Sequence, residues 1–340
     1  MVKQRIQKVT IKDIARMCNV STQTISRVLN KRPDVSPETR ETVERAMAEM
    51  GYRPSALARS LVQQRSYTLG VIIAGLRYVG VAQTLNGINE ACEESNYSLL
   101  LKELPHFNSP NIVPVIESLI ANHVEGIIYA APDINENVKV VQSQLPSFCP
   151  PIVFLKSQSN PNYASICVDN YGGARQAVEY LLSLGRRHIG LITGPLDWLE
   201  ARQRKQGWED ALTNVGIETG AHKWAQGNWS SASGESAFAE LIQKYPQMNA
   251  LFASNDQMAL GALHYCHAHG ISVPEDLAVV GFDNLTESAH FTPALTTITH
   301  PLREAGQMAV KSLLEQIEGH TAINQVITLQ TELIVRTSTP

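Results

Sequence analysis

The 340-residue sequence lacks the features that mark membrane, secreted and metal-binding proteins. It has no apolar run approaching the roughly 18 residues of a membrane-spanning helix, and its opening stretch, MVKQRIQKVT, is charged where a secretory signal would be apolar. The five cysteines are scattered, odd in number and form no CxxC pair, so we expect buried free thiols rather than disulfides or a zinc site. We therefore expect a cytoplasmic protein with no membrane partner.

Motifs for catalysis and for cofactors are also missing. The sequence has no GxxxxGK[ST] or GxGxxG loop, no GxSxG nucleophile elbow and no HExxH motif. In HYCHAHG, His264 and His267 stand three residues apart beside Cys266, but no second ligand pair lies at a zinc-motif spacing, so a surface helix is expected. The sequence predicts neither an enzyme nor a bound cofactor or metal.

Charge is distributed unevenly along the chain. Residues 1–65 hold 13 lysines and arginines against 6 acidic residues, a net charge of +7, whereas the remainder holds 15 basic and 26 acidic residues, a net charge of −11. A basic head on an acidic body suggests that the head alone binds a polyanion. A solvated terminal segment is the alternative, and charge by itself does not separate the two.

Three short helices are expected in this head. The first follows Thr10, the second follows Ser21, and the third opens at Ser36-Pro37, where a hydroxyl can cap and proline suits the first helical position. The third helix ends near Gly51. Because only a short turn joins the first two helices, the pattern predicts a helix-turn-helix.

The second helix carries a polar face opposite its apolar side chains. In VSTQTISRVLN, Ile25, Val28 and Leu29 share one side. Gln can bond adenine with both ends of its amide, Arg can grip guanine or a phosphate, and Thr can contact a thymine methyl. A face that meets only water is the alternative, but the helix-turn-helix and the basic head together favour double-stranded DNA. The outward-facing residues are Thr22, Gln23, Ser26, Arg27 and Asn30.

The segment Tyr52–Ser66 is interpreted as a hinge. Pro54 stops the preceding helix. Leu57 and Leu61 then stand four residues apart around Ala58, on one or two helical turns. Such a short helix is marginal alone, so it would order when paired with its copy and with DNA, where Leu61 could wedge into the minor groove. An ordinary linker is the alternative.

Past Tyr67, apolar β-type runs alternate with helical patterns. Buried strands in such an alternation argue for parallel α/β sheets, and the length favours two lobes with a cleft, where ligands bind beyond the strand carboxyl ends. The strand candidates are Leu69–Ile73, Tyr97–Leu101, Gly126–Ala130, Ile152–Leu155, His188–Ile192, Ala250–Ala253 and Leu277–Gly281. The helix candidates are Ile112–Asn122, Gly172–Leu184, Gln206–Val215, Asp256–His269 and Leu302–Ile317.

Four groups suited to a sugar stand after these strands. Arg204 follows IGLITGPLDW, Asn255 follows ALFAS, and Asp283 follows LAVVGF, while Trp229 lies in the loop QGNWSSASG. Guanidinium, amide and carboxylate groups suit vicinal hydroxyls, and an indole can lie against a pyranose ring. Each alone is more often a cap or loop residue (Asp256 could simply cap its helix), but four at corresponding sheet edges favour a ligand cleft.

The stretches TIKDIARMCNVSTQTISRVLN, VSPETRETVERAMAEMGYRPSALARSL and TLGVI together resemble the lactose/galactose-repressor (LacI/GalR) family of transcription regulators. The resemblance runs from about Val9 to the end of the chain. It implies that Thr22 and Gln23, with Arg27, read bases, and Thr22 leaves the operator sequence open because this position varies in the family. It also implies supporting or minor-groove roles for other residues. Ser21, Thr24, Ser26 and Asn30 would contact phosphates or support the helix, and Ala58 and Leu61 would enter the minor groove.

In the body, GPLDWLEARQRKQGW, NWSSASG, SNDQMALGAL and LAVVGFDNLTES resemble the family's effector-binding core. This implies effector contacts at Arg204, Trp229, Asn255 and Asp283, in a periplasmic-binding-protein fold with three chain crossings. One departure is Lys156 after PIVFL, where sugar-binding relatives often carry Asp or Asn. Lys156 would favour a phosphate or carboxylate on the ligand, pair with Asp283, or point to solvent as most loop lysines do.

The predicted fold class is α/β, with a three-helix head and a two-lobed effector domain of parallel sheets flanked by helices. The expected domains are 1–53 for the head, 54–66 for the hinge and 67–340 for effector binding and dimerisation. The N-lobe would comprise about 67–167 plus 300–327, and the C-lobe about 168–299 plus 328–340. No leucine heptads follow TELIVRTSTP, so a homodimer reading a pseudo-palindromic operator is expected.

The predicted function is a DNA-binding transcription regulator, foremost a repressor, whose operator affinity is controlled by a small effector, a sugar or a sugar derivative. A sugar receptor without a DNA role is one alternative, which the charged N-terminus and the basic head count against. An α/β enzyme acting on the sugar is another, and it would need a base–nucleophile pair. A corepressor as effector, or an activating role, stays open.

Overall fold

The computed structural model describes residues 9–29, 32–52, 65–107, 109, 111–157, 163–319 and 326–340. The chain divides into two compact units, Met1–Tyr67 and Thr68–Pro340. Among the predicted DNA contacts, Asn30, Ala58 and Leu61 lie outside the described residues.

The first unit contains the helices α1 (Ile11–Met17), α2 (Thr22–Leu29) and α3 (Pro37–Glu49). At the start of α1, the Asp13 carboxylate accepts hydrogen bonds from the backbone N–H and the hydroxyl of Thr10, at 3.0 and 2.7 Å. These contacts satisfy groups that a helix start leaves unpaired. The three helices share one small core, which confirms the predicted helix-turn-helix head. Its buried residues are Ile14, Ala15, Ile25, Val28, Val43 and Ala46.

The N-lobe of the second unit is built on a parallel six-stranded sheet in the order β11-β5-β4-β3-β1-β2. Buried residues of α5 (Val79–Glu94) and α12 (Leu302–Ile317) pack on one face, and those of α6 (Val113–Ala121) and α7 (Asn137–Ser143) pack on the other. The strands are β1 (Thr68–Ile73), β2 (Ser98–Glu103), β3 (Gly126–Tyr129), β4 (Ile152–Leu155), β5 (Ala164–Val168) and β11 (Val326–Leu329).

The C-lobe repeats this plan with the strand order β12-β10-β9-β8-β6-β7, in which β12 pairs antiparallel with β10. Helices α8 (Asn170–Ser183) and α9 (Leu199–Thr213) pack on one face, and α10 (Ser231–Lys244) and α11 (Asp256–Ala268) on the other. The strands are β6 (Ile189–Thr193), β7 (Trp224–Gln226), β8 (Ala250–Ala253), β9 (Ala278–Asp283), β10 (Thr296–Thr299) and β12 (Leu333–Ile334). The predicted two-lobed α/β fold is confirmed.

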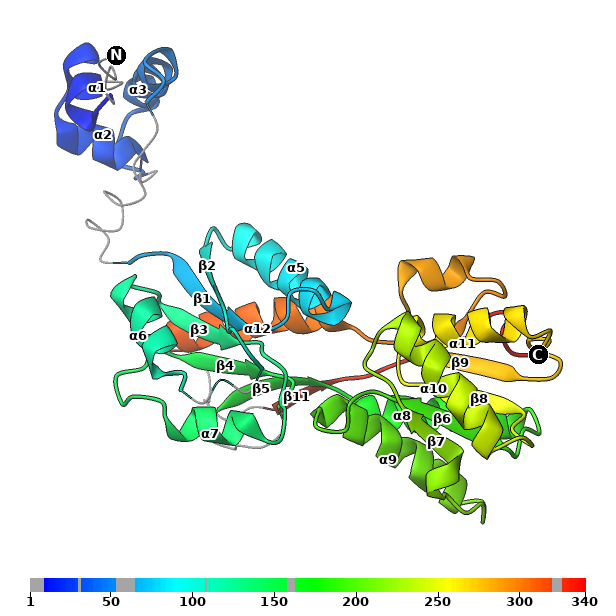
Figure 1. The fold of residues 1–340 in the computed structure, drawn as a ribbon. Helices are drawn as coiled ribbons and strands as arrows, with labels where there is room; N and C mark the ends of the chain where they lie inside the picture. The colour runs from blue at the N-terminus through cyan, green and yellow to red at the C-terminus, as the bar shows by residue number, and fades with distance from the viewer. Residues whose placement is uncertain are drawn as a thin grey trace, which may run out of the picture. The chain divides into compact units, whose positions relative to one another are not determined.

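Each lobe is discontinuous in sequence. The described chain passes between the lobes after β5, after β10 and after β11. Figure 1 shows the consequence, since the late elements α12 (orange) and β11 (red) lie among the early elements of the N-lobe. The cleft between the lobes is therefore spanned by three connections.

Helices α5 and α12 approach each other at the level of their backbones. A Cβ atom on Gly87 would lie 1.9 Å from the carbonyl oxygen of Arg303, and one on Gly306 would lie 2.3 Å from that of Thr84. Because real Cβ atoms do not come so close to backbone atoms, both positions require glycine for this helix packing.

One predicted helix boundary is wrong in a way that matters for the site. The sequence predicts a helix at Gln206–Val215, whereas α9 spans Leu199–Thr213. Its N-cap residue, Trp198, makes no side-chain capping hydrogen bond, so the usual Ser, Thr, Asn or Asp signal is missing. The earlier start places Arg204 on the helix rather than on the segment before it.

The described residues include no helix that is both long and apolar enough to cross a membrane. The five cysteines are free thiols, and Cys92, Cys167 and Cys266 are buried.

Candidate ligand cleft and nucleic-acid interface

Helix α2 presents the predicted DNA-contacting residues on its outer face. The side chains of Thr22, Gln23 and Arg27 are exposed, whereas Ile25 and Val28 of the same helix are buried in the core of the head. This arrangement leaves a hydroxyl, an amide and a guanidinium available to a groove.

The predicted supporting residues interact at the start of α2. Ser21 caps the helix, because its hydroxyl accepts a hydrogen bond from the backbone N–H of Thr24 at 3.0 Å. The two hydroxyls lie 2.9 Å apart, and the side chain of Thr24 is half-buried. Ser26 is also half-buried, on the opposite flank of the helix. Arg27 forms an ion pair with Asp34 at 3.5 Å.

All five predicted effector-contacting residues line one cavity of about 530 Å³ between the two lobes of the second unit. Lys156 follows β4 of the N-lobe, while Arg204, Trp229, Asn255 and Asp283 belong to the C-lobe. Parallel sheets bring the carboxyl ends of their strands to the same edge, which explains why residues so far apart in sequence meet here. Other lining residues were not predicted from the sequence. They include Tyr78, Trp198, Glu200, Gln257 and His300.

Arg204 is the most heavily bonded side chain of the cleft. Its Nε donates to the Asn170 side chain at 2.9 Å, one Nη donates to the carbonyl oxygen of Ser254, and an ion pair of 3.5 Å joins it to Asp283. Its guanidinium also lies 3.6 Å from the ring centroid of Phe282. Burial lowers the pKa of Arg204, against the opposing influence of Asp283. Most of its donors serve the protein, so Arg204 orders the cleft as well as lining it.

Asp283 and His300 form the second part of this network. Nδ1 of His300 lies 2.9 Å from Oδ1 of Asp283 and 3.3 Å from Nη2 of Arg204. Burial raises the pKa of Asp283 to about 6, although Arg204 and Lys156 pull it down. Burial, Arg204 and Lys156 together hold the pKa of His300 well below its ordinary value, so the ring is neutral at pH 7.

Trp229 belongs to a group of aromatic side chains drawn from both lobes. Its ring contacts Trp198 edge-on at 5.8 Å, and Trp198 contacts Tyr78 and Phe107 of the N-lobe at 5.5 and 5.1 Å. A Cβ atom on Gly194 would come within 2.2 Å of the Trp229 ring. Within the described ranges the buried Nε1 of Trp229 has no hydrogen-bond partner, so a ligand oxygen would satisfy it.

Backbone contacts close one side of the cleft beside this aromatic group. Ile134 and Trp198 form an antiparallel bridge across the lobes. The N–H of Leu199 donates to the carbonyl oxygen of Asp133 at 3.0 Å, and that of Asn135 donates to Asp197 at 2.9 Å. The lobes are therefore held together at this point.

Asn255, not Asp256, caps α11. Its side-chain oxygen accepts from the N–H of Met258 at 2.8 Å, and its amide nitrogen donates to the carbonyl oxygen of Trp229 at 3.0 Å. Asp256 instead accepts hydrogen bonds from Ser288, Thr297 and Leu285, at 2.6, 2.5 and 2.8 Å. Burial raises the pKa of Asp256 to about 7. Asn255 thus fixes Trp229, and Asp256 ties α11 to the loops behind the cleft.

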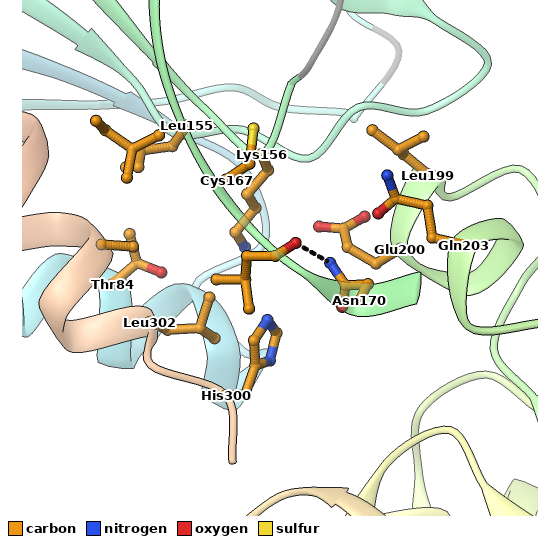
Figure 2. A pocket seen from close by; sticks show the side chains of 13 residues that line it. Thr84, Leu155, Lys156, Cys167, Asn170, Leu199, Glu200, Gln203, His300 and Leu302 are labelled. Atoms are coloured by element: carbon orange, nitrogen blue, oxygen red, sulfur yellow. Dashed lines mark hydrogen bonds between the residues drawn. The ribbon is translucent and has the colours of Figure 1, made fainter. Parts of the chain in front are cut away.

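Lys156 and Glu200 face each other from opposite lobes. Figure 2 shows both side chains extending into a smaller cavity that adjoins the cleft and shares Lys156, Glu200, His300 and Leu302 with it. Lys156 forms no ion pair within 4.0 Å and no side-chain hydrogen bond among the described residues, so of the three alternatives for this residue the pairing with Asp283 does not form. The Oε2 atom of Glu200 is buried and has no hydrogen-bond partner among these described residues.

The segment around His264 forms part of α11. The His264 side chain is two-thirds exposed and lies 3.9 Å from Glu235, while Cys266 is buried. Within the described ranges, no group of three or more His, Cys, Asp or Glu side chains could hold a metal ion.

Two family models match the chain. Residues 10–55, which contain the helix-turn-helix, match the model described as bacterial regulatory proteins of the lacI family. Residues 178–339 match a periplasmic binding protein-like domain. The two matches together define a DNA-binding regulator with an effector domain.

Full-length relatives show the same combination. The chain is 30% identical over 338 residues to the HTH-type transcriptional repressor PurR of Aliivibrio fischeri (strain MJ11), covering 97% of this chain and 98% of the relative. It superposes with a TM-score of 0.87 on the lac repressor dimer bound to operator and the anti-inducer ONPF, at 32% identity over 98% of this chain and 99% of that one. A complex of the regulator CelR with cellobiose gives a TM-score of 0.72, at 29% identity over 97% of this chain and 100% of that one.

The chain belongs to the LacI family of transcriptional regulators. Members of this family regulate transcription and are not enzymes.

Proposed function

We propose that the protein is a repressor that binds a pseudo-palindromic operator as a homodimer and releases it when a sugar or sugar derivative binds between the lobes. The observation that carries this proposal is the convergence of Lys156, Arg204, Trp229, Asn255 and Asp283 on one interlobe cavity. The solved relatives bind ligands of the same kind, namely operator and an anti-inducer in one case and cellobiose in the other.

The proposal divides the work between the two units. In each head, Thr22, Gln23 and Arg27 would read bases. The residues that would contact phosphates or support the helix are Ser21, Thr24, Ser26 and Asn30. Ala58 and Leu61 would enter the minor groove. Residues 1–53 would act as the head, 54–66 as the hinge and 67–340 as the effector and dimerisation domain. Since operator is chromosomal DNA, the protein would work in the cytoplasm. Effector binding would change the lobe arrangement, and by linkage operator and effector would weaken each other's binding equally.

The test begins with the DNA. Operator sequences would be selected from a random library with the full-length protein, and binding would be measured by fluorescence anisotropy at a fixed salt concentration. A panel of sugars would then be screened by thermal shift, since specific ligands raise the melting temperature by mass action.

A compound that raises the melting temperature should also weaken binding to the selected operator. The variant Gln23→Ala should lose operator affinity and keep the thermal shift. Stabilisation by sugars without any effect on DNA binding would contradict the proposed allosteric control. Tighter DNA binding with the sugar would instead make the effector a corepressor.

A further inference from the structure

Two polar groups of the cleft remain unused by the protein. Glu200 on α9 is only 7% exposed, and its buried Oε2 atom has no hydrogen-bond partner in the part of the chain that the structure describes. Lys156 after β4 is half-buried, and its ammonium has no hydrogen bond or ion pair among the described residues. A buried carboxylate oxygen without a donor is costly, so a ligand that supplies a donor would gain binding energy there.

The other charges of the cleft already compensate each other. Arg204 and Asp283 form an ion pair at 3.5 Å, and the neutral ring of His300 contacts both. Among the described residues that line the cleft, this leaves Lys156 as the one cation and Glu200 as the one carboxylate that face the ligand. Burial lowers the pKa of Lys156, while the nearby Glu200 raises it. One ammonium and one carboxylate together carry no net charge for a charged ligand to neutralise.

Ligand groups differ in how well they suit such a pair. A phosphate or carboxylate accepts a hydrogen bond from Lys156, but it has no donor for Glu200 and is repelled by it. An ammonium donates to Glu200, but it has no acceptor for Lys156 and is repelled by it. A hydroxyl accepts with a lone pair and donates its one proton, so a single hydroxyl can satisfy both residues.

We propose that Lys156 and Glu200 together select an uncharged, polyhydroxylated ligand, one hydroxyl of which accepts from Nζ of Lys156 and donates to Oε2 of Glu200. Because the two residues belong to different lobes, that hydroxyl also bridges the N-lobe and the C-lobe. Lys156 thus acts in a matched pair and does not make the site specific for anions. The inference rests on the proposed function of this cleft as the effector site.

The experiment compares matched neutral and charged sugars on the full-length protein. The panel holds glucose, galactose, cellobiose and lactose beside glucose 6-phosphate, galactose 6-phosphate, glucuronate, galacturonate and glucosamine, screened by thermal shift and followed by calorimetry. At least one neutral sugar should bind, and its charged counterparts should bind at least about tenfold more weakly, because each leaves one charge-assisted hydrogen bond unmade.

Variants of Lys156 and Glu200 test whether these two residues are responsible for the preference for neutral sugars. Glu200→Gln and Lys156→Met should each lower the affinity for the neutral sugar about tenfold or more. The fold loss of affinity in the double variant should be smaller than the product of the losses in the two single variants, because both residues bind the same hydroxyl. Monodeoxy analogues should identify one hydroxyl position whose removal weakens binding to the wild type more than it weakens binding to Glu200→Gln. Glu209→Gln is the matched control, since Glu209 lies on the same helix, pairs with Lys205 and does not line the cleft.

Three results would overturn the proposal: binding of charged sugars alone, no binding of any neutral sugar, or wild-type affinity in Glu200→Gln and Lys156→Met. Operator binding measured in parallel keeps this test separate from the proposed function. A sugar acid that releases the operator would refute the selection by Lys156 and Glu200 while leaving the ligand-controlled repressor intact. A neutral sugar that binds through the pair without changing DNA binding would support the selection by Lys156 and Glu200 and would refute the ligand-controlled repressor.

Discussion

Nδ1 of His300 lies 2.9 Å from Oδ1 of Asp283, and the imidazole is neutral because its pKa is held well below the ordinary value. An ionised carboxylate can only accept a hydrogen bond. Nδ1 of His300 therefore carries the ring proton, and this N–H donates a hydrogen bond to Asp283. The ion pair with Arg204 reaches the same oxygen, with Nη1 3.5 Å from Oδ1, and the ionisation of Asp283 decides how well the carboxylate accepts.

Effector binding should therefore depend on pH through Asp283. Its pKa is raised to about 6, so the accepting carboxylate is present above this value and is lost as the pH falls through it. We expect effector affinity to fall by up to about tenfold per pH unit below 6. Calorimetry across this range would measure it, and Asp283→Asn should bind more weakly with no such slope.

The contribution of Asp283 to the free energy of unfolding changes with pH in the opposite direction to effector affinity. A carboxyl whose pKa is raised on folding contributes stability that is fully present below the unfolded pKa of about 3.9 and is lost as the pH rises through about 6. The difference in melting temperature between the wild type and Asp283→Asn should thus shift in favour of the variant as the pH rises. A difference that does not change with pH would mean that Asp283 titrates normally.

Arg204 should matter for stability as well as for effector binding. Arg204→Ala removes the partner of Asp283 and the donors to Asn170 and Ser254, and leaving a buried charge without its partner costs about 3–5 kcal/mol. Urea unfolding would measure this loss. Arg303→Ala is the control, because its ion pair with Glu90 involves a side chain that is two-thirds exposed, and water screens such a pair so that it contributes little. Equal stability of both variants would show that Arg204 is not structural.

Trp229 should report ligand binding by its fluorescence. It lines the cavity beside Trp198, whereas Trp224 lies on β7 outside it. Ligand binding should change the intrinsic fluorescence of the wild type and of Trp224→Phe, and the change should be smaller in Trp229→Phe because its indole faces the ligand. An unaltered change in Trp229→Phe would remove this residue from the site.

Arg27 should contribute to operator binding in a way that another head arginine does not. Its guanidinium is on the exposed face of α2, while Arg45 is on α3 and pairs with Glu41. Arg27→Ala should weaken binding to the selected operator by about 1–3 kcal/mol, roughly 5- to 150-fold, if Arg27 binds guanine. Arg45→Ala loses the same charge and should have a smaller effect. Anisotropy titrations at several salt concentrations would show whether Arg27 contacts a base or a phosphate.

The sequence predicted those parts of the fold whose patterns are strong. Ile152–Leu155 and Ala250–Ala253 are uninterrupted apolar runs, and both are strands with these bounds. Shorter or mixed segments were not predicted, such as β7 with three residues and β12 with two. Helix α5 was missed as well, since its glycines and β-branched residues weaken the helical pattern although Gly87 is needed for packing.

The candidate site was predicted from polar residues that follow recognised strands, and this rule also explains what was missed. His300 follows β10, a strand that was not predicted, and Glu200 lies in the first turn of a helix whose start carries no capping signal. From sequence, Asp283 was the partner considered for Lys156, whereas Glu200 was not considered because it precedes the helix predicted at Gln206–Val215. Only the tertiary structure brings the two charges together.

The three passages of the chain between the lobes have a consequence for how the protein is made. The N-lobe sheet needs β11, which pairs with β5, and its face needs α12, and both are translated after almost the whole C-lobe. While the ribosome is still synthesising the C-lobe, the β5 edge and the side of α5 that contacts α12 remain uncovered. Neither lobe can finish folding before the other is nearly complete, so the two must mature together after synthesis ends.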